Sequence, residues 1–527
     1  MQIRPWLVLL LASSLARTAP AAEQIPAHRV VVVVFDGMRP DFVTPETTPN
    51  VWRLAQRGVF FAHHHPVYLS STEVNGTAIA TGAYPAHSFI IANKDFRPRI
   101  DPQKPVDTQD PEAVSKGDAV SGGHYLGAPT TAEILRAHGT ATAIAGSKQV
   151  ALLHDRSAPG DSAAPVRLIF EGTTARQVTD PAMAALGPFP ENGPGDDKHL
   201  RDAWTTRALL EVLWHDQVPA YSLLWLAEPD STQHITGPGT PAALTAIKSS
   251  DDNLGRVLAE LERRGLTAAT DVLVVSDHAF STIARKVDVA VELSTAGFDA
   301  KRAAPGGLQS GDVLAVGNGG STLLYVGRHD AETVRKLVEF LQQQDWVGVI
   351  FSRTGEAGTF PLTEAHIDSP EAPDLVVSLR WMPGKSANGT PGLHTSDLAP
   401  NVNKFGNHAS LSPYDMHNTL VAAGPDFRRG VMNTLPSGNT DIAPTVLWLL
   451  GLRDEAKKMD GRVLGEALII DAPPLKSYEL RRLTAHRETG AGTWAQYLQV
   501  SEVNGVRYLD EGNGANEPKS GATGAGK

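Results

Sequence analysis

The chain has 527 residues, of which 41% are hydrophobic and 20% charged, as in folded proteins with a sizeable core and unlike disordered chains. The formal net charge of −11 argues against binding to nucleic acid polymers or anionic membranes, although bound cations would still allow a small anionic substrate. The absence of cysteine excludes disulfides, a cysteine nucleophile and cysteine-ligated zinc, so any metal must be held by Asp, Glu and His.

The first 22 residues have the pattern of a signal peptide. Arg4 supplies the positive charge, residues 6–15 form a short apolar run, and Ala19-Pro20-Ala21 resembles a cleavage signal. We expect cleavage after Ala21 or Ala22, which would give a periplasmic or secreted protein without a membrane span. The alternative is an uncleaved N-terminal anchor, for which the apolar run is short.

Strands and helices alternate between residues 30 and 283, which is typical of a doubly wound, mostly parallel α/β sheet. We expect strands at residues 30–35, 141–145, 221–227 and 272–276, and helices at 51–57, 72–81, 130–139, 200–214 and 241–264. Thr130 and Glu133 form a capping-box pattern at the third of these helices. Residues 94–123 lack periodicity and are rich in Pro, Asp and Lys, which predicts a long surface loop.

The pattern changes between residues 284 and 400. Short strands at 322–326, 347–351 and 374–379 surround one helix at 331–344, which predicts a small α/β cap subdomain. It would be inserted into a catalytic domain formed by residues 23–283 and 401–475, whose last helix is the apolar segment 437–452. Residues 476–527 are expected to form a C-terminal extension, with a hairpin at Asn504-Gly505 and a disordered tail after Asn513.

Potential metal ligands directly follow three of the expected strands. The residues are Asp36 after the first strand, Asp230 and His234 after the strand at 221–227, and Asp277 and His278 after the strand at 272–276. Ligands bind beyond the carboxyl ends of parallel strands, so these groups should converge at one edge of the sheet. His408 adds another imidazole. Carboxylate and imidazole ligands favour zinc or another transition metal, and hence a hydrolytic enzyme.

Thr72 stands where the second expected helix begins, so nearby backbone N–H groups could receive an anion there. A hydroxyl is a poor nucleophile unless a base or a metal lowers its pKa. Asn75 lies on the same side of the first helical turn. From the residues alone, Thr72 could equally be a helix cap, and Ser70 or Ser71 could be the nucleophile.

The chain resembles the alkaline phosphatase superfamily, and most closely its type I phosphodiesterase/nucleotide pyrophosphatase branch. The matching segments, from about residue 30 to residue 470, are VVVVFDGMRPD, TPNVWRLAQRG, TEVNGTAIATGAYPAH, EPDSTQH, VVSDHAF, GNHAS and TDIAPTVLWLLG. The resemblance implies two zinc ions. One would be held by Asp230, His234 and His408, and the other by Asp36, Asp277 and His278, with Thr72 as the nucleophile and metal-bound alkoxide. It also implies that Asn75 contacts a non-bridging phosphate oxygen.

The chain departs from the family pattern in three places. Ala279 and Ala409 replace glycines that usually follow the ligand histidines, and both replacements are small. Glu73-Val74 replaces a Phe-Pro pair, which bears on the nucleotide-binding side of the pocket rather than on the metals. Sulfatase chemistry is disfavoured, because it needs a Cys or Ser that is converted to formylglycine.

These observations predict an exported dizinc phosphodiesterase that acts on a small phosphate diester through a phosphothreonine intermediate. A phosphomonoesterase or phosphonate hydrolase is the nearest alternative, and such a site needs an additional cation. Lys148 and Arg156 are the candidates, but we expect both to be peripheral, and the histidines at 63–65 and His417 to be ordinary surface or core residues. A non-catalytic binding protein with structural metals is disfavoured, because structural zinc sites have four protein ligands. The oligomeric state is left open.

Overall fold

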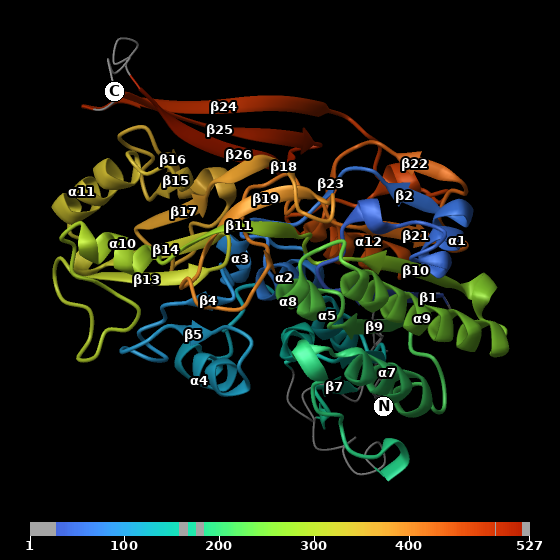
Figure 1. Cartoon of the computed structure of the whole chain (residues 1–527). Coiled ribbons are helices and arrows are strands. Elements are labelled where there is room, and N and C mark those ends of the chain that lie inside the picture. The colour runs from blue at the N-terminus through green and yellow to red at the C-terminus, as the bar shows by residue number, and fades with distance from the viewer. Residues whose placement is uncertain (1–27, 157–166, 175–183, 491, 519–527) are drawn as a thin grey trace, which may run out of the picture.

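A nine-stranded sheet with the order β22-β2-β21-β10-β1-β9-β6-β7-β8 forms the centre of the molecule (Figure 1). The computed structural model describes residues 28–156, 167–174, 184–490 and 492–518, so the expected signal peptide at residues 1–22 lies outside the described residues. The strands are β1 (Arg29–Phe35), β2 (Val59–Phe61), β6 (Thr142–Gly146), β7 (Leu168–Phe170), β8 (Thr173–Thr174), β9 (Tyr221–Leu226), β10 (Thr270–Val275), β21 (Leu420–Ala423) and β22 (Val431–Asn433).

The middle of this sheet is parallel and covered on both faces. β1 pairs in parallel with β9 on one side and with β10 on the other, whereas β21 pairs antiparallel with β10. The five consecutive valines at residues 30–34 are fully buried and alternate between two hydrophobic clusters, one on each face of the sheet. The mostly parallel, doubly wound sheet expected from the sequence is therefore confirmed.

Helices on the two faces supply these two clusters. One face is covered by α1 (Pro49–Arg57), α7 (His199–Arg207) and α9 (Pro241–Arg263), and the other by α2 (Thr72–Thr81), α5 (Thr131–Ala137) and α12 (Ile442–Leu449). The predicted capping box is present: Glu133 N donates to Thr130 Oγ1, and Thr130 N donates to Glu133 Oε2. A short helix, α8 (Asp230–Thr236), directly follows β9 and carries two of the expected ligands.

Two further sheets lie beside the central one (Figure 1). The larger has the order β12-β13-β14-β17-β15-β16, and the smaller has the order β18-β19-β11-β20. Their elements are β11 (Ser281–Val287), α10 (Val289–Thr295), β12 (Ala300–Lys301), β13 (Val313–Asn318), β14 (Ser321–Val326), α11 (Ala331–Leu341), β15 (Val347–Ser352), β16 (Phe360–Pro361), β17 (Leu375–Leu379), β18 (Trp381–Lys385), β19 (Pro391–Asp397) and β20 (Gly406–Asn407). These sheets fit the expected insertion at 284–400, whose bounds remain a prediction.

The C-terminal residues form a three-stranded antiparallel sheet of β24 (Tyr478–Glu488), β25 (Gly492–Val503) and β26 (Val506–Pro518). It spans the top of the view in Figure 1 and packs apolar side chains onto β15, including Leu498 of β25. The expected hairpin turn at Asn504-Gly505 joins β25 and β26. The disordered tail does not begin after Asn513 as expected, because β26 continues to Pro518 by pairing with β25. Residues 519–527 lie outside the described residues.

The expected loop at residues 94–123 is wrong in its second half, which forms α4 (Pro111–Ser121) after the short strands β4 (Lys94–Asp95) and β5 (Val106–Asp107). Asp110 caps this helix by accepting hydrogen bonds from the N–H groups of Glu112 and Ala113, and Pro111 occupies the first turn. Only Ala113, Val114 and Gly117 of α4 are buried, so the apolar pattern that reveals most helices is weak here.

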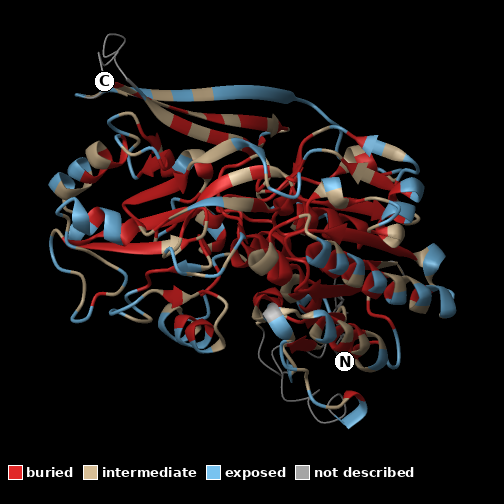
Figure 2. Cartoon of the chain, viewed as in Figure 1, coloured by how far each residue is buried: buried red, intermediate tan, exposed pale blue. Residues whose placement is uncertain are grey.

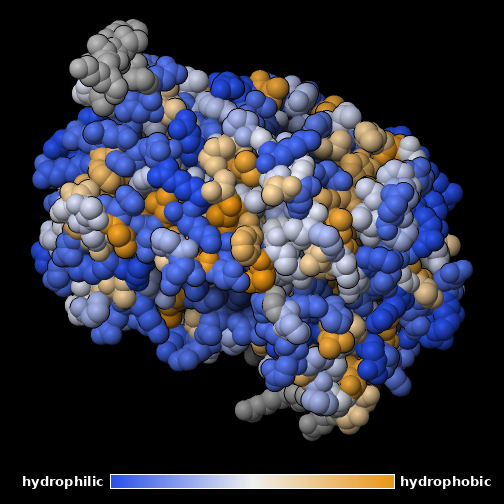
Figure 3. All heavy atoms as spheres, viewed as in Figure 1, coloured by the Kyte–Doolittle hydropathy of each residue, from blue (hydrophilic) through white to orange (hydrophobic). Residues whose placement is uncertain are grey.

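Buried residues fill the nine-stranded sheet, the sheet that contains β13 to β17, and the region between them (Figure 2). Exposed residues are concentrated on the outer helices and loops. The face shown in Figure 3 is mostly hydrophilic, with apolar residues in small, separate groups. Within the described residues, no helix combines the length and the apolar character needed to cross a membrane.

Candidate metal centre

The three groups of expected ligands meet at one edge of the central sheet. β9, β1 and β10 are adjacent, and the chain leaves their carboxyl ends at Asp230, Asp36 and Asp277. Within each of two sets, the ligand atoms lie no more than 4.8 Å from one another. One set is Asp36, Asp277 and His278, and the other is Asp230, His278 and His408. His234 joins them through its Nε2, which lies 3.3 Å from Asp230 Oδ1. Adjacent parallel strands thus deliver the ligands to one place.

Each of the three carboxylates has one oxygen that is held by the protein and one that is not. Asp36 Oδ2 accepts a hydrogen bond from Trp225 Nε1 (2.9 Å), and Asp277 Oδ1 accepts one from Gly37 N (3.0 Å). Asp230 Oδ2 accepts from Lys148 Nζ (2.7 Å). The other oxygens, Asp36 Oδ1, Asp230 Oδ1 and Asp277 Oδ2, are buried and have no hydrogen-bond partner among the described residues. Unpartnered buried carboxylate oxygens are costly, unless a cation binds them.

The three histidines are oriented in the same way. In each ring, Nδ1 donates to a backbone carbonyl: His234 to Gly406 (3.0 Å), His278 to Ala279 (3.1 Å) and His408 to Ser70 (2.9 Å). A carbonyl can only accept, so Nδ1 carries the proton and Nε2 of each neutral ring keeps a lone pair that faces the carboxylates. This orientation of a metal-binding imidazole by a second hydrogen bond is typical of zinc sites.

Burial and mutual repulsion raise the pKa of two of the carboxylates. Burial, with the charge of Asp277, raises the pKa of Asp36 to about 8, and burial raises the pKa of Asp277 to about 7. Burial alone would also raise the pKa of Asp230, but the ammonium group of Lys148 keeps it well below its usual range. The residues present fit divalent metal ions, because such ions would neutralise this crowded negative charge and bind the three free oxygens.

Thr72 begins α2 and touches this cluster. Its Oγ1 lies 3.2 Å from His278 Nε2, and the residue is only 3% exposed. Ser70 Oγ instead donates to the carbonyl of Ser410, and Ser71 Oγ is buried with no partner among the described residues. Of the three neighbouring hydroxyls, the one on Thr72 is in contact with a ligand imidazole, which supports it as the reacting group.

The side chain of Asn75, expected to contact a phosphate oxygen, is used within the protein, whereas that of Asn93 has a donor beside Thr72 that is free among the described residues. The amide nitrogen of Asn75 donates to the carbonyls of Val67, Leu69 and Ser71, and its fully buried side chain therefore holds the loop before α2. Asn93 was not singled out in the sequence, yet its Oδ1 accepts from Glu73 N (3.1 Å), beside Thr72. No described residue accepts from the amide nitrogen of Asn93, which makes Asn93 a better candidate than Asn75 for binding a phosphate oxygen.

Lys148 is not peripheral, which corrects the expectation for this residue. Its Nζ lies 2.9 Å from Asp36 Oδ2 and 2.7 Å from Asp230 Oδ2, so its charge sits within the ligand cluster. Burial alone would lower the pKa of Lys148, but Asp230 and Asp36 raise it well above its usual range, so the amine is charged. Arg156 is peripheral as expected, because it pairs with Asp118 at 2.7 Å.

Comparison with known proteins agrees with this geometry. Residues 30–408 match the family model described as type I phosphodiesterase/nucleotide pyrophosphatase. Ectonucleotide pyrophosphatase/phosphodiesterase family member 3 of Mus musculus is 22% identical over 52% of this chain and 27% of its own length. A bis(5'-adenosyl)-triphosphatase of Xenopus laevis is 20% identical over 80% of this chain and 78% of its own length. The chain thus spans little more than a quarter of the first of these relatives.

Among solved structures, murine ectonucleotide pyrophosphatase/phosphodiesterase 5 in complex with AMP has the same fold. The match has a TM-score of 0.57 at 18% sequence identity, and covers 80% of this chain and 95% of the murine one. The human counterpart gives a TM-score of 0.56 at 17% identity, with the same coverage.

Proposed function

Because the chain belongs to the type I phosphodiesterase/nucleotide pyrophosphatase family, we propose that it is an exported dizinc phosphodiesterase that acts on a small phosphate diester. The observation that carries this proposal is the convergence of three free carboxylate oxygens and three histidine Nε2 atoms beside the hydroxyl of Thr72. Export rests on the signal-peptide pattern of residues 1–22.

We assign the ligands to two sets, as the family resemblance implies. Asp36, Thr72, Asp277 and His278 would hold one zinc ion, and Asp230, His234 and His408 would hold the other; His278 lies close to ligand atoms of both sets. When bound, the two ions would lower the pKa of the Thr72 hydroxyl and offset the negative charge of the phosphate oxygens.

The protein groups around Thr72 would position the substrate. Thr72 Oγ1 attacks phosphorus, a new oxygen–phosphorus bond forms, and the bond to the leaving alcohol breaks, with the hydroxyl proton passing to that alcohol. The phosphothreonine intermediate still carries the second alcohol as an ester, and water then hydrolyses its bond to Thr72, which restores the hydroxyl and releases a phosphate monoester. The amide nitrogen of Asn93 can donate to a non-bridging phosphate oxygen, because its oxygen is already held by Glu73 N.

The test is to trap the intermediate. The zinc-loaded enzyme is mixed with an aryl phosphodiester, quenched in acid and mapped by mass spectrometry, and we expect on Thr72 a phosphoryl group that still carries one substrate alcohol. Thr72→Ala should fold and bind zinc but lose turnover, and Thr72→Ser should keep part of it. Phosphate on Ser70 or Ser71, or full turnover after removal of all metal, would contradict the proposal.

Lys148 favours a second candidate, a phosphomonoesterase or phosphonate hydrolase with the same ligands. A monoester carries about one more negative charge than a diester, and a partly buried ammonium between Asp36 and Asp230 could interact with that charge once metals neutralise the carboxylates. Relative turnover of an aryl diester, the matching monoester and a phosphonate distinguishes the two candidates.

A further inference from the structure

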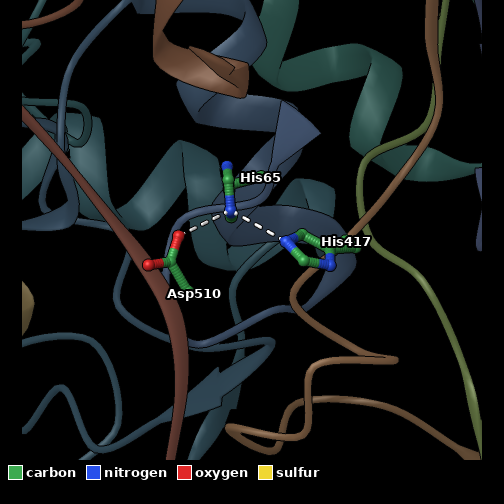
Figure 4. Close-up of side chains that lie close together, drawn as sticks. All are labelled: His65, His417 and Asp510. Carbon is green, nitrogen blue, oxygen red and sulfur yellow. Dashed lines mark hydrogen bonds and ion pairs between the residues drawn. The ribbon is translucent and has the colours of Figure 1, made fainter. Parts of the chain in front are cut away.

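A second group of two imidazoles and one carboxylate shares no residue with the candidate metal centre and lies where the C-terminal sheet meets the main domain (Figure 4). His65 Nε2 is 3.0 Å from His417 Nε2 and 3.0 Å from Asp510 Oδ1. The three residues come from distant parts of the chain: β3 (His64–His65), the segment before β21, and β26. His65 is only 1% exposed and His417 is partly buried.

The hydrogen bonds of His65 leave a lone pair at the centre of this group. Its Nδ1 lies 3.0 Å from the carbonyl oxygen of Ser437, which can only accept, so Nδ1 carries the proton. In the neutral ring, Nε2 is then an acceptor, and it faces the carboxylate of Asp510, which is also an acceptor. Two acceptors 3.0 Å apart repel each other, unless a cation lies between them. The imidazoles of the candidate metal centre are oriented by the same kind of Nδ1 bond.

Within the described ranges, no lysine or arginine supplies that cation. Among these residues, His65 Nε2 is the only basic side-chain nitrogen at ion-pair distance from Asp510, and the carboxylate otherwise accepts from Ser501 Oγ (2.9 Å). The ring of Tyr508 stacks against His65 at 5.8 Å, which fixes the plane of the imidazole. The ring of the exposed His63 lies 6.0 Å from His417, on the side that faces solvent.

We propose that His65, His417 and Asp510 bind a divalent transition-metal ion of the zinc type, separate from the ions proposed beside Thr72. Zinc holds imidazole nitrogen at 2.0–2.1 Å and carboxylate oxygen at about the same distance, so neighbouring ligands of a tetrahedral ion lie about 3.3 Å apart. The two separations of 3.0 Å need to open by only a few tenths of an ångström, and the third pair, His417 with Asp510, lies within 4.8 Å. Two imidazoles and one carboxylate suit zinc better than calcium or magnesium, and water would complete the coordination.

An ion at this position would join β26 to the main domain. Loop closure between residues 65 and 510 is entropically costly in the unfolded chain, and a metal that binds only the folded arrangement stabilises the protein by mass action. We therefore assign this ion a structural role.

The experiment compares metal content and thermal stability in the full chain. The wild type, His417→Ala and Asp510→Asn are stripped with a chelator, loaded with zinc, freed of excess ion and analysed by mass spectrometry for zinc per chain. Each variant should hold one zinc fewer than the wild type, and zinc should raise its Tm by less. His87→Ala is the matched control, because His87 is exposed and pairs with Asp460 at 2.8 Å without a third ligand. It should bind as much zinc as the wild type.

Equal zinc content in the wild type and both variants would overturn the proposal, and would leave a proton on His65 as the cation. If the variants do not fold, zinc-loaded crystals of the wild type decide the question. An anomalous peak at about 2 Å from all three ligand atoms supports the site, and the absence of a peak there rejects it. Neither outcome depends on the ions beside Thr72, whose ligands Asp36 and Asp277 are not altered.

Discussion

At the residue scale, the candidate centre contains one charged lysine, Lys148, between two of its carboxylates. We predict that Lys148→Met lowers kcat/KM for an aryl monoester at least about tenfold more than for the matching diester, a difference of ~1.4 kcal/mol. The reason is that the Lys148 ammonium is the only Lys or Arg group that the structure pairs with Asp36 and Asp230 within the described residues. Steady-state kinetics on both esters measure this difference.

Arg156→Ala provides the control for this prediction, because Arg156 is paired with Asp118 instead of the ligands. This variant should not change the ratio of kcat/KM for the monoester to kcat/KM for the diester. Equal losses on both esters in Lys148→Met would show that Lys148 positions the carboxylates and does not select the substrate.

Glu73 carries a second prediction at this scale. Burial, with the charge of Asp107, holds the pKa of Glu73 well above its ordinary value of 4.5, and its Oε2 has no hydrogen-bond partner among the described residues. The unfolded chain therefore loses this proton at a lower pH than the folded one, and stability falls as pH rises above about 4.5. Glu73→Gln removes this loss, so the Tm of the variant relative to the wild type should increase between pH 5.5 and pH 8.

The measurement is a thermal melt at several pH values with zinc present. The exposed Glu46→Gln is the control, and its Tm difference should not change with pH. A Tm difference for Glu73→Gln that is constant over the range would mean that the carboxyl is ionised in the folded protein.

The expected ligands Asp36, Asp230 and Asp277 follow strongly apolar strands. The carboxyl ends of these parallel strands share one edge of the sheet, and the structure brings the three carboxylates together there. Lys148 follows β6, whose run of small residues gave a weaker signal, although the same rule would have placed Lys148 at this edge. Asn93 reaches Glu73 through a loop, so no periodicity connects the two residues.

At the scale of elements, local signals identified most helices and strands, and failed where an element is held by few apolar contacts. α9 was expected at nearly its observed bounds, because Thr240, Pro241 and Gly265 mark its ends. α4 is not predicted, although Asp110-Pro111 is a helix-start signal, because the composition of residues 94–123 favours a loop. The end of β26 lies within the segment expected to be disordered. Its pairing with β25 depends on backbone groups, which composition does not describe.

The capping box of α5 gives a prediction at this scale. Thr130→Ala should lower the free energy of unfolding by about 1 kcal/mol, because the N–H of Glu133 loses its acceptor and the box opens. Urea denaturation measures this change. Thr245→Ala is the control, since Thr245 is exposed inside α9 and alanine favours helix there. A loss as large in Thr245→Ala would mean that the effect is not due to capping.

At the scale of the whole molecule, the C-terminal sheet is joined to the catalytic region by polar groups as well as by apolar packing. Tyr508 of β26 donates from its hydroxyl to Asp441 Oδ2 (2.8 Å) and accepts from Arg462 Nε (3.0 Å), and all three groups are buried. Asp441 lies directly before α12, which packs against α2, the helix that begins at Thr72. A change at this joint can therefore reach the candidate metal centre through two packed helices.

We predict that Tyr508→Phe lowers the free energy of unfolding by about 1–3 kcal/mol, because the ring is kept but the buried Asp441 and Arg462 each lose a partner. The comparison is with Tyr478→Phe on β24, which removes a hydroxyl from a residue that is 49% exposed and should change stability by less than about 0.5 kcal/mol. If the C-terminal sheet unfolds together with the central one, chemical denaturation of Tyr508→Phe will remain a single transition at lower denaturant. An early, separate transition that leaves turnover intact would instead show that the C-terminal sheet is an independent unit and that catalysis does not need it.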